Sequence, residues 1–133
     1  MQSIYLDENL SEYVAEALNQ LNKGYFPQIT VYSTKLEFGK GTPDEFLIPK
    51  IGEEGSVMVT RDFNIKRTQL QYELCKKSKI GLFFLSPTKG SERHWDIVKL
   101  LINHWEEIVK KSAIESHPFA FKITAKGKFY KLE

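Results

Sequence analysis

The sequence predicts an α/β fold with a central, mostly parallel sheet flanked by helices and a β-hairpin at the C-terminal end. Short apolar runs alternate with segments whose apolar residues repeat at helical spacing. The run at 80–85 is apolar almost throughout, as expected of a strand covered on both faces. Residues 119–123 alternate instead, and a glycine-containing turn leads into a second β-rich run at 129–132, which is typical of a hairpin.

The first part of the chain predicts a strand, a helix and a second strand. The strands are expected at 3–6 and 28–33, where apolar residues cluster or alternate. Asn9 or Ser11 can cap the helix between them, and Gly24 marks its end. The residues expected on its buried face are Leu10, Val14, Ala17, Leu18 and Leu21.

A second helix is expected to open at Thr42, after a loop at 39–41. Thr42 is a suitable cap, Pro43 fits the first turn, and the acids Asp44 and Glu45 face the positive end of the helix. Pro49 lacks a backbone donor, so this helix is expected to break there or to be short.

The remaining elements continue the alternation. A strand is expected at 56–60, a helix at 64–77, the buried strand at 80–85 and a long amphipathic helix at 91–111. The apolar stripe of that last helix consists of Trp95, Val98, Leu101, Ile102, Trp105, Ile108 and Val109.

Size and composition indicate one domain, 1–133, with an ordinary core. No apolar run approaches the roughly 20 residues that a membrane-spanning helix needs, and no secretory signal is expected. Cys75 is the one cysteine in the sequence and is expected to be a small buried hydrophobe, which fits a reducing, cytoplasmic location. The net charge of +2 neither indicates nor excludes a nucleic-acid partner.

Acidic residues follow the predicted strands at three places. Asp7 and Glu8 end the first strand, Asp44 and Glu45 come after the second, and Asp62 follows the third. Ligands of open α/β sheets bind at the carboxyl ends of the strands. If the strands are parallel, these acids therefore converge on one edge.

Carboxylates held close together repel one another, and a hard divalent cation removes that repulsion. Mg²⁺ prefers oxygen ligands, and Mn²⁺ occupies similar sites. An ion placed there activates water and neutralises charge on a phosphodiester. The alternative interpretation is that Asp7, Glu8, Asp44 and Glu45 are helix-start residues favoured by the macrodipole.

Three segments together resemble a known family. Leu-Asp-Glu-Asn-Leu at 6–10, Thr-Pro-Asp-Glu-Phe-Leu at 42–47 and Val-Met-Val-Thr-Arg-Asp-Phe at 57–63 are similar, in order and spacing, to PIN-like domains, in particular the VapC-type toxins of type II toxin–antitoxin systems. The resemblance covers most of the chain. Each motif is short, and it is the three in register that carry the resemblance.

The resemblance implies a single PIN-like domain that is a metal-dependent endoribonuclease. Asp7, Asp44 and Asp62 match the family's metal-binding acids, and Glu8 matches a frequent acidic neighbour, so these four are the expected catalytic residues with Mg²⁺ or Mn²⁺ as cofactor. An RNA substrate and an antitoxin protein are implied. A homodimer is left open as a further partner, and no membrane is expected. Asn64 stands where many relatives carry a further acid, which puts a second metal position and full activity in question.

Basic residues near the third acid are candidates for holding RNA phosphates. Arg61, Lys66 and Arg67 flank it in the sequence. Lys66 and Arg67 can instead form a solvated helix face, and Arg61 can instead pair with Asp62 or Glu8.

Lysines and aromatic residues also gather in the hairpin. They can bind single-stranded RNA or can protect an edge strand from pairing. This set consists of Lys122, Lys126, Lys128, Phe129, Tyr130 and Lys131. The three histidines lack a compact ligand spacing and are expected to be structural, and Trp95 and Trp105 to lie in the core or at an interface.

Two other functions compete with the nuclease. A phosphoacceptor receiver domain also carries acids after its first and third strands, and Ser86 would supply its hydroxyl. It would need a lysine just after its fifth strand, and 119–124 ends without one. A catalytically inactive PIN-like module that binds RNA or protein is the other alternative, and Asn64 keeps it open.

Overall fold

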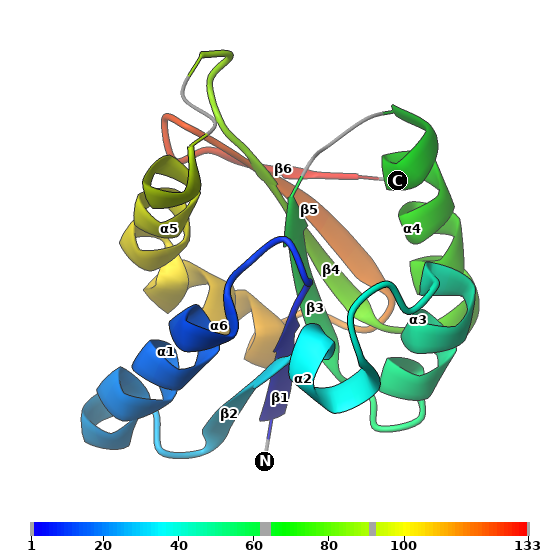
Figure 1. The fold of residues 1–133 in the computed structure, drawn as a ribbon, viewed down its shortest axis with the longest axis horizontal. Coiled ribbons are helices and arrows are strands. Elements are labelled where there is room, and N and C mark those ends of the chain that lie inside the picture. The colour runs from blue at the N-terminus through cyan, green and yellow to red at the C-terminus, as the bar shows by residue number, and fades with distance from the viewer. Residues whose placement is uncertain (1, 62–64, 91–92, 133) are drawn as a thin grey trace.

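The computed structural model describes residues 2–61, 65–90 and 93–132 (Figure 1). The strands are β1 Gln2–Leu6, β2 Ile29–Ser33, β3 Val57–Arg61, β4 Gly81–Ser86, β5 Phe119–Thr124 and β6 Phe129–Lys131. The helices are α1 Glu12–Tyr25, α2 Thr34–Phe38, α3 Asp44–Gly52, α4 Ile65–Ser78, α5 His94–Asn103 and α6 Trp105–Ile114. Asp62 and Asn64 lie outside the described residues.

The strands form one sheet in the order β2-β1-β3-β4-β5-β6. The first five are parallel to their neighbours, and β6 pairs antiparallel with β5. The predicted α/β class, the mostly parallel sheet and the C-terminal hairpin are therefore confirmed. A short helix, α2, was not predicted, and it directly follows β2.

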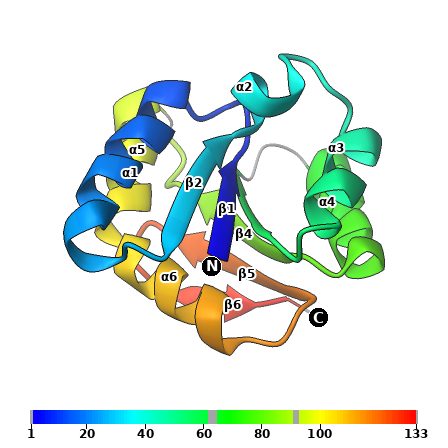
Figure 2. The same ribbon diagram turned by 90° about the horizontal axis from the view of Figure 1, so that it is seen from below.

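Each face of the sheet has its own apolar core, because successive side chains of a strand point to opposite faces. On one face, called the α1 face, Leu6, Val59, Phe83 and Phe121 pack with residues of α1, α5 and α6. On the other, the α4 face, the sheet residues pack with α3 and α4. These are Tyr5, Met58, Leu82, Phe84 and Ala120. Figure 2 shows the two groups of helices on opposite sides of the strands.

Side-chain hydrogen bonds fix α1 against the outer strand, β2. Ser11 is the N-cap of α1 and accepts a hydrogen bond from the Tyr13 backbone. The Asn19 amide donates to the Val31 carbonyl oxygen and accepts from the Val31 N–H, both at 2.8 Å. The predicted face of α1 was partly wrong, because Ala17 is exposed, Leu21 is 59% exposed, and Ala15 is buried instead.

Helix α3 is short, with nine residues, but it differs from its prediction at Thr42 and does not break at Pro49. Pro43 is the N-cap, while the Thr42 hydroxyl donates to the carbonyl oxygens of Phe38, which ends α2, and of Gly39. The helix continues through Pro49 to Gly52. Burial of Leu47, Ile48 and Ile51 against the sheet offsets the hydrogen bond that proline cannot make.

The long helix expected at 91–111 is two helices that meet at His104. His104 has φ −115° and ψ 12°, which interrupts the helical path between α5 and α6. After this bend, the Trp105 indole donates to Asn22 of α1 at 2.9 Å in a buried contact. Trp105 is therefore in the core, but Trp95 is 67% exposed and Ile102 is 42% exposed, which contradicts their place in the predicted stripe.

Two further findings concern individual features. Cys75 is fully buried in the core of the α4 face, as expected. Within the described ranges, none of the helices combines the length and apolar character that crossing a bilayer requires.

Candidate active site at the carboxyl ends of the strands

Asp7 lies directly after β1 and is the most enclosed acid of the site. Its backbone N–H donates to Val59 of β3 at 3.0 Å, which continues the strand pairing and fixes where the side chain begins. Only 2% of the residue is exposed. The carboxylate accepts hydrogen bonds from the Thr60 hydroxyl at 3.0 Å and from the Asn9 amide at 2.9 Å.

Asp44 reaches the same place from the start of α3. The Arg67 guanidinium, from α4, joins the two acids. Its Nη2 lies 3.1 and 3.3 Å from the two Asp7 carboxylate oxygens, and its Nε lies 3.2 Å from Asp44 Oδ2. The end of β1 and the start of α3 therefore meet at the guanidinium that α4 supplies.

Two buried polar side chains, Thr60 and Gln71, form a hydrogen-bonded chain that ends at Asp7. Thr60 is fully buried in β3, and its hydroxyl also accepts a hydrogen bond from the Gln71 amide at 3.4 Å. Gln71 is one turn after Arg67 on α4 and is itself buried. A buried polar group costs free energy unless it is hydrogen-bonded. The Gln71–Thr60–Asp7 chain meets that requirement and fixes the carboxylate.

The electrostatics of the site are dominated by burial. Desolvation raises the pKa of Asp7, and the nearby Asp44 charge adds to that rise. Arg67 and the Thr60 hydroxyl act in the opposite direction without cancelling the rise. Burial lowers the pKa of Arg67, but the charges of Asp7 and Asp44 outweigh it and raise that pKa. The negative charge at Asp7 is thus only partly compensated.

Glu8 is oriented toward a neighbouring loop. Its carboxylate accepts a hydrogen bond at 3.0 Å from the Gly41 N–H, just before α3. This contact joins the end of β1 to the loop that carries Asp44. The catalytic role of Glu8 stays a prediction.

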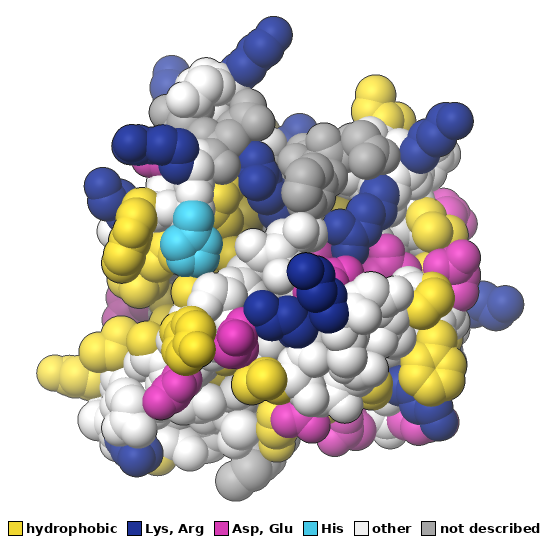
Figure 3. Space-filling view, viewed as in Figure 1, with side chains coloured by type: hydrophobic (Ala, Val, Ile, Leu, Met, Phe, Trp, Pro, Cys, Tyr) yellow, Lys and Arg dark blue, Asp and Glu magenta, His cyan; other side chains and the backbone are white. Residues whose placement is uncertain are grey.

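The basic residues predicted to hold RNA occupy different positions. Arg61 ends β3 and is half-buried, Lys66 is exposed near the start of α4, and Arg67 is the bridge between the two acids. In Figure 3, much of the dark blue lies in the upper half of the view, around the carboxyl ends of the strands. Binding of RNA by these three residues stays a prediction.

The described part of the site supplies two carboxylates for a cation. Within 2–61, 65–90 and 93–132, no group of three His, Cys, Asp or Glu residues is placed to hold a metal ion. Asp62, the third predicted ligand, lies outside those residues, although it directly follows β3, the neighbour of β1. The donor chemistry fits a hard divalent cation, because two carboxylates already converge and Asp7 is undercompensated.

Sequence reasoning missed the supporting residues Asn9, Thr60 and Gln71. The sequence does contain a signal for the contacts of Arg67 and Gln71. Arg67, Gln71 and Cys75 recur every four residues and so share one face of α4, which is the face toward the sheet. Polar residues at a buried helical spacing indicate a hydrogen-bonded network.

The geometry defines an α/β protein with an acidic site at the carboxyl edge of its sheet. The strand order alone is shared with receiver-like folds. A family model described as "PIN like domain" matches residues 2–87. This match covers more than half of the chain, which therefore belongs to the PIN-like family, a nuclease superfamily. Comparison with curated proteins and with solved structures found no match.

Proposed function

We propose that this PIN-like protein is a metal-dependent endoribonuclease. The observation that carries the proposal is the meeting of Asp7 and Asp44, from β1 and α3, on a single positive charge at the carboxyl edge of the sheet. The carboxylates of Asp7, Asp44 and Asp62 would hold Mg²⁺ or Mn²⁺, with Glu8 as a further ligand or base. PIN-like membership supports nuclease chemistry in general.

The chain's own residues would prepare hydrolysis of an RNA phosphodiester. Thr60 and Asn9 hold the Asp7 carboxylate in one orientation, and the start of α3 holds Asp44 opposite it. A bound divalent ion would supply a more acidic water and neutralise charge on the phosphate. Arg61 and Lys66 would hold neighbouring phosphates. Water adds to phosphorus, one ester P–O bond breaks, and the departing alkoxide takes a proton.

The direct test is incubation of the purified protein with a total RNA pool, with Mg²⁺ or with EDTA. We expect cleavage with Mg²⁺ only, and a roughly 100-fold slower reaction in Asp7→Asn, which keeps the side-chain shape but removes a charged ligand. Glu106→Gln on α6, which packs on the opposite face, is the matched control and should retain parental activity. Cleavage that persists in Asp7→Asn would overturn the assignment.

We further propose that the nuclease is the toxin of a toxin–antitoxin pair. Three motifs in register with such toxins support this role. An antitoxin protein would then cover the acidic site, and the protein itself would act as a monomer or a homodimer in the cytoplasm. Induced expression should arrest bacterial growth, and co-expression of the adjacent gene should restore it. Equal growth arrest by Asp7→Asn would contradict a toxin that acts through cleavage.

An inactive PIN-like module that binds RNA or protein is the second candidate. Arg67 favours it, because this guanidinium already pairs with both acids and offsets part of the charge that a metal ion would otherwise balance. A Mn²⁺ titration followed by thermal shift separates the two functions. Stabilisation of the parent protein but not of Asp7→Asn supports the nuclease, and no stabilisation of either supports the module.

A further inference from the structure

A straight row of side chains crosses the sheet from the acidic site to the hairpin. Thr60, which donates to Asp7, is in register with Phe84 of β4, Phe84 with Lys122 of β5, and Lys122 with Tyr130 of β6. Residues in register on neighbouring strands point to the same face of a sheet. Strands lie about 4.8 Å apart, so Lys122 is roughly 10 Å from Thr60 along the row.

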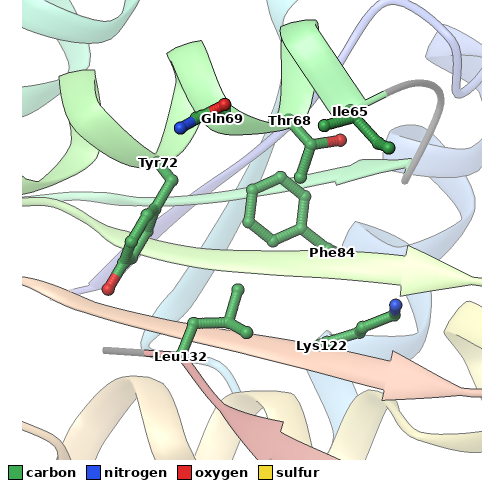
Figure 4. Close-up of a pocket in the computed structure, with 7 residues that line it drawn as sticks. All are labelled: Ile65, Thr68, Gln69, Tyr72, Phe84, Lys122 and Leu132. Carbon is green, nitrogen blue, oxygen red and sulfur yellow. The ribbon is translucent and has the colours of Figure 1, made fainter.

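The hairpin end of this row forms an open groove. Helices α3 and α4 cover the other part of the α4 face, and the groove lies beside α4 with a volume of about 480 Å³. Phe84 and Lys122 lie at its floor, Thr68 and Tyr72 of α4 line one side, and Leu132 lies opposite (Figure 4). Thr68 directly follows Arg67, so the first turns of α4 contribute to both the groove and the acidic site.

A second hollow lies on the next strand of the row, because Lys122 in the lining of the first is in register with Tyr130 in the lining of the second. It measures about 400 Å³ and is lined by Lys126, Lys128 and Tyr130, together with the hydroxyl residues Ser86 and Thr124. Tyr130 is 51% exposed, and both lysines are exposed. An aromatic ring therefore lies between one lysine in the first hollow and two in the second.

We infer that these two hollows bind the single-stranded RNA that flanks the cleavage point, an inference that rests on the proposed function. The lysines complement the phosphate backbone, and the exposed Tyr130 ring offers a base a surface for stacking. The apolar floor at Phe84 and Leu132 accommodates a base face without requiring a particular sequence. The RNA thus leaves the acidic site across β4 and β5 and reaches the hairpin.

Charge favours RNA over an apolar protein segment as the occupant. An apolar peptide would have to desolvate the Lys122 ammonium at the floor of the groove, whereas a phosphate pairs with it. Lys126 and Lys128 extend the positive charge in the same direction.

The test is fluorescence anisotropy with a labelled 12-nucleotide single-stranded RNA of mixed sequence in EDTA, so that binding is separated from cleavage. Lys122→Gln should weaken binding about 3- to 10-fold and reduce the slope of log affinity against log salt by about 0.7. Tyr130→Ala should weaken binding at least about 5-fold through lost stacking. Lys110→Gln, an exposed lysine of α6 on the opposite face, is the matched control and should bind within twofold of the parent.

The outcomes distinguish this inference from the nuclease itself. If Lys122→Gln and Tyr130→Ala bind like the parent, or if the parent binds no RNA, the groove assignment is overturned. The nuclease assignment is tested independently, by the magnesium-dependent cleavage assay. If Leu132→Glu dissociates a dimer in gel filtration while RNA binding is unchanged, the groove belongs to a second copy and the inference fails. If both variants bind RNA more weakly but the parent cleaves no RNA, the groove assignment is supported and the nuclease assignment is rejected.

Discussion

Arg67 provides the positive charge on which Asp7 and Asp44 meet, and a metal ion held by the same two carboxylates, as in the proposed nuclease, would compete with it. A guanidinium and a divalent cation compete for the same carboxylate oxygens, because those oxygens gain most from the nearest positive charge. In the proposed metal site, Arg67 would therefore stabilise the metal-free state and oppose binding of the ion. Its side chain is 27% exposed, which leaves it room to turn toward solvent or substrate.

Replacement of Arg67 should separate these two effects. Without metal, Arg67→Gln is expected to lose about 1–3 kcal/mol of unfolding free energy, because two acids remain close together without their shared partner. Mn²⁺ should then raise the melting temperature of Arg67→Gln more than that of the parent. Arg67→Lys, which keeps the charge, is the control and should respond like the parent. An equal Mn²⁺ response in parent and Arg67→Gln would show that the guanidinium and the ion do not compete.

Cys75 shows how burial controls the chemistry of one side chain. Burial raises the pKa of its thiol to about 12, and the Sγ donates to the Ile80 carbonyl oxygen at 2.9 Å. The thiol is ionised in the unfolded chain near its ordinary pKa of 9.0, but not in the folded chain. The stabilisation is therefore complete below pH 9 and is lost as the pH rises from 9 toward 12.

The corresponding experiment compares urea midpoints at pH 8 and pH 10. The parent should lose more stability between these values than Cys75→Ala, which has no thiol to ionise. A disulfide reagent should modify the native thiol at least about 100-fold more slowly than the urea-unfolded one. Rapid modification of the native protein would mean that α4 opens readily from the sheet.

At the scale of elements, the contact between α1 and β2 explains how the outer strand is protected. The backbone N–H and carbonyl of Val31 point away from the sheet, and the Asn19 side chain hydrogen-bonds to both. An unpaired strand edge is a template for another strand. The amide thus takes the place of a neighbouring residue and closes that edge.

Asn19→Ala should expose this edge. The expected loss is about 1–3 kcal/mol of unfolding free energy, because two backbone groups lose their partners. Light scattering at high protein concentration should rise as well. Asn103→Ala, at an exposed position of α5, should change neither quantity measurably. If Asn19→Ala keeps parental stability, water replaces the amide without cost.

The bend at His104 shows where element-level patterns stop being informative. The apolar spacing from Val98 to Val109 is continuous in sequence, so it predicts one helix. Directly after the bend, Trp105 donates a hydrogen bond to Asn22, a partner 83 residues earlier. Helix propensities of the residues around 104 cannot predict a contact with a residue so far away in the sequence.

For the whole molecule, patterns of residues predicted the sheet and much of its site. Buried and alternating strands, and acids at their carboxyl ends, were enough to bring Asp7 and Asp44 together. The sequence did not place Arg67 between them or Thr60 beneath Asp7. Those contacts depend on how α4 is rotated over the sheet, and many buried residues fix that rotation jointly.

The distribution of charge over the molecule matters more than its net charge of +2. Exposed Lys66, Lys126 and Lys128 lie toward the carboxyl ends of the strands. If RNA binds there through about three or four phosphates, raising KCl from 50 to 200 mM should weaken binding about 20- to 50-fold. Anisotropy in EDTA measures this dependence. Salt-independent binding would mean that stacking, rather than charge, holds the RNA.

The closed edge at Asn19 also bears on how the protein behaves when it is concentrated. A net charge of +2 gives copies little mutual repulsion at long range, so colloidal stability must come from local devices. At the β2 edge of the sheet, the Asn19 amide occupies the backbone groups of Val31 to which another strand could otherwise pair. At the other edge, β6 is only three residues long, follows Lys128 and ends in Lys131. At high concentration, two copies therefore approach each other either at the hydrogen-bonded β2 edge or at the positively charged β6 edge. Neither edge favours pairing into a continuous sheet between molecules.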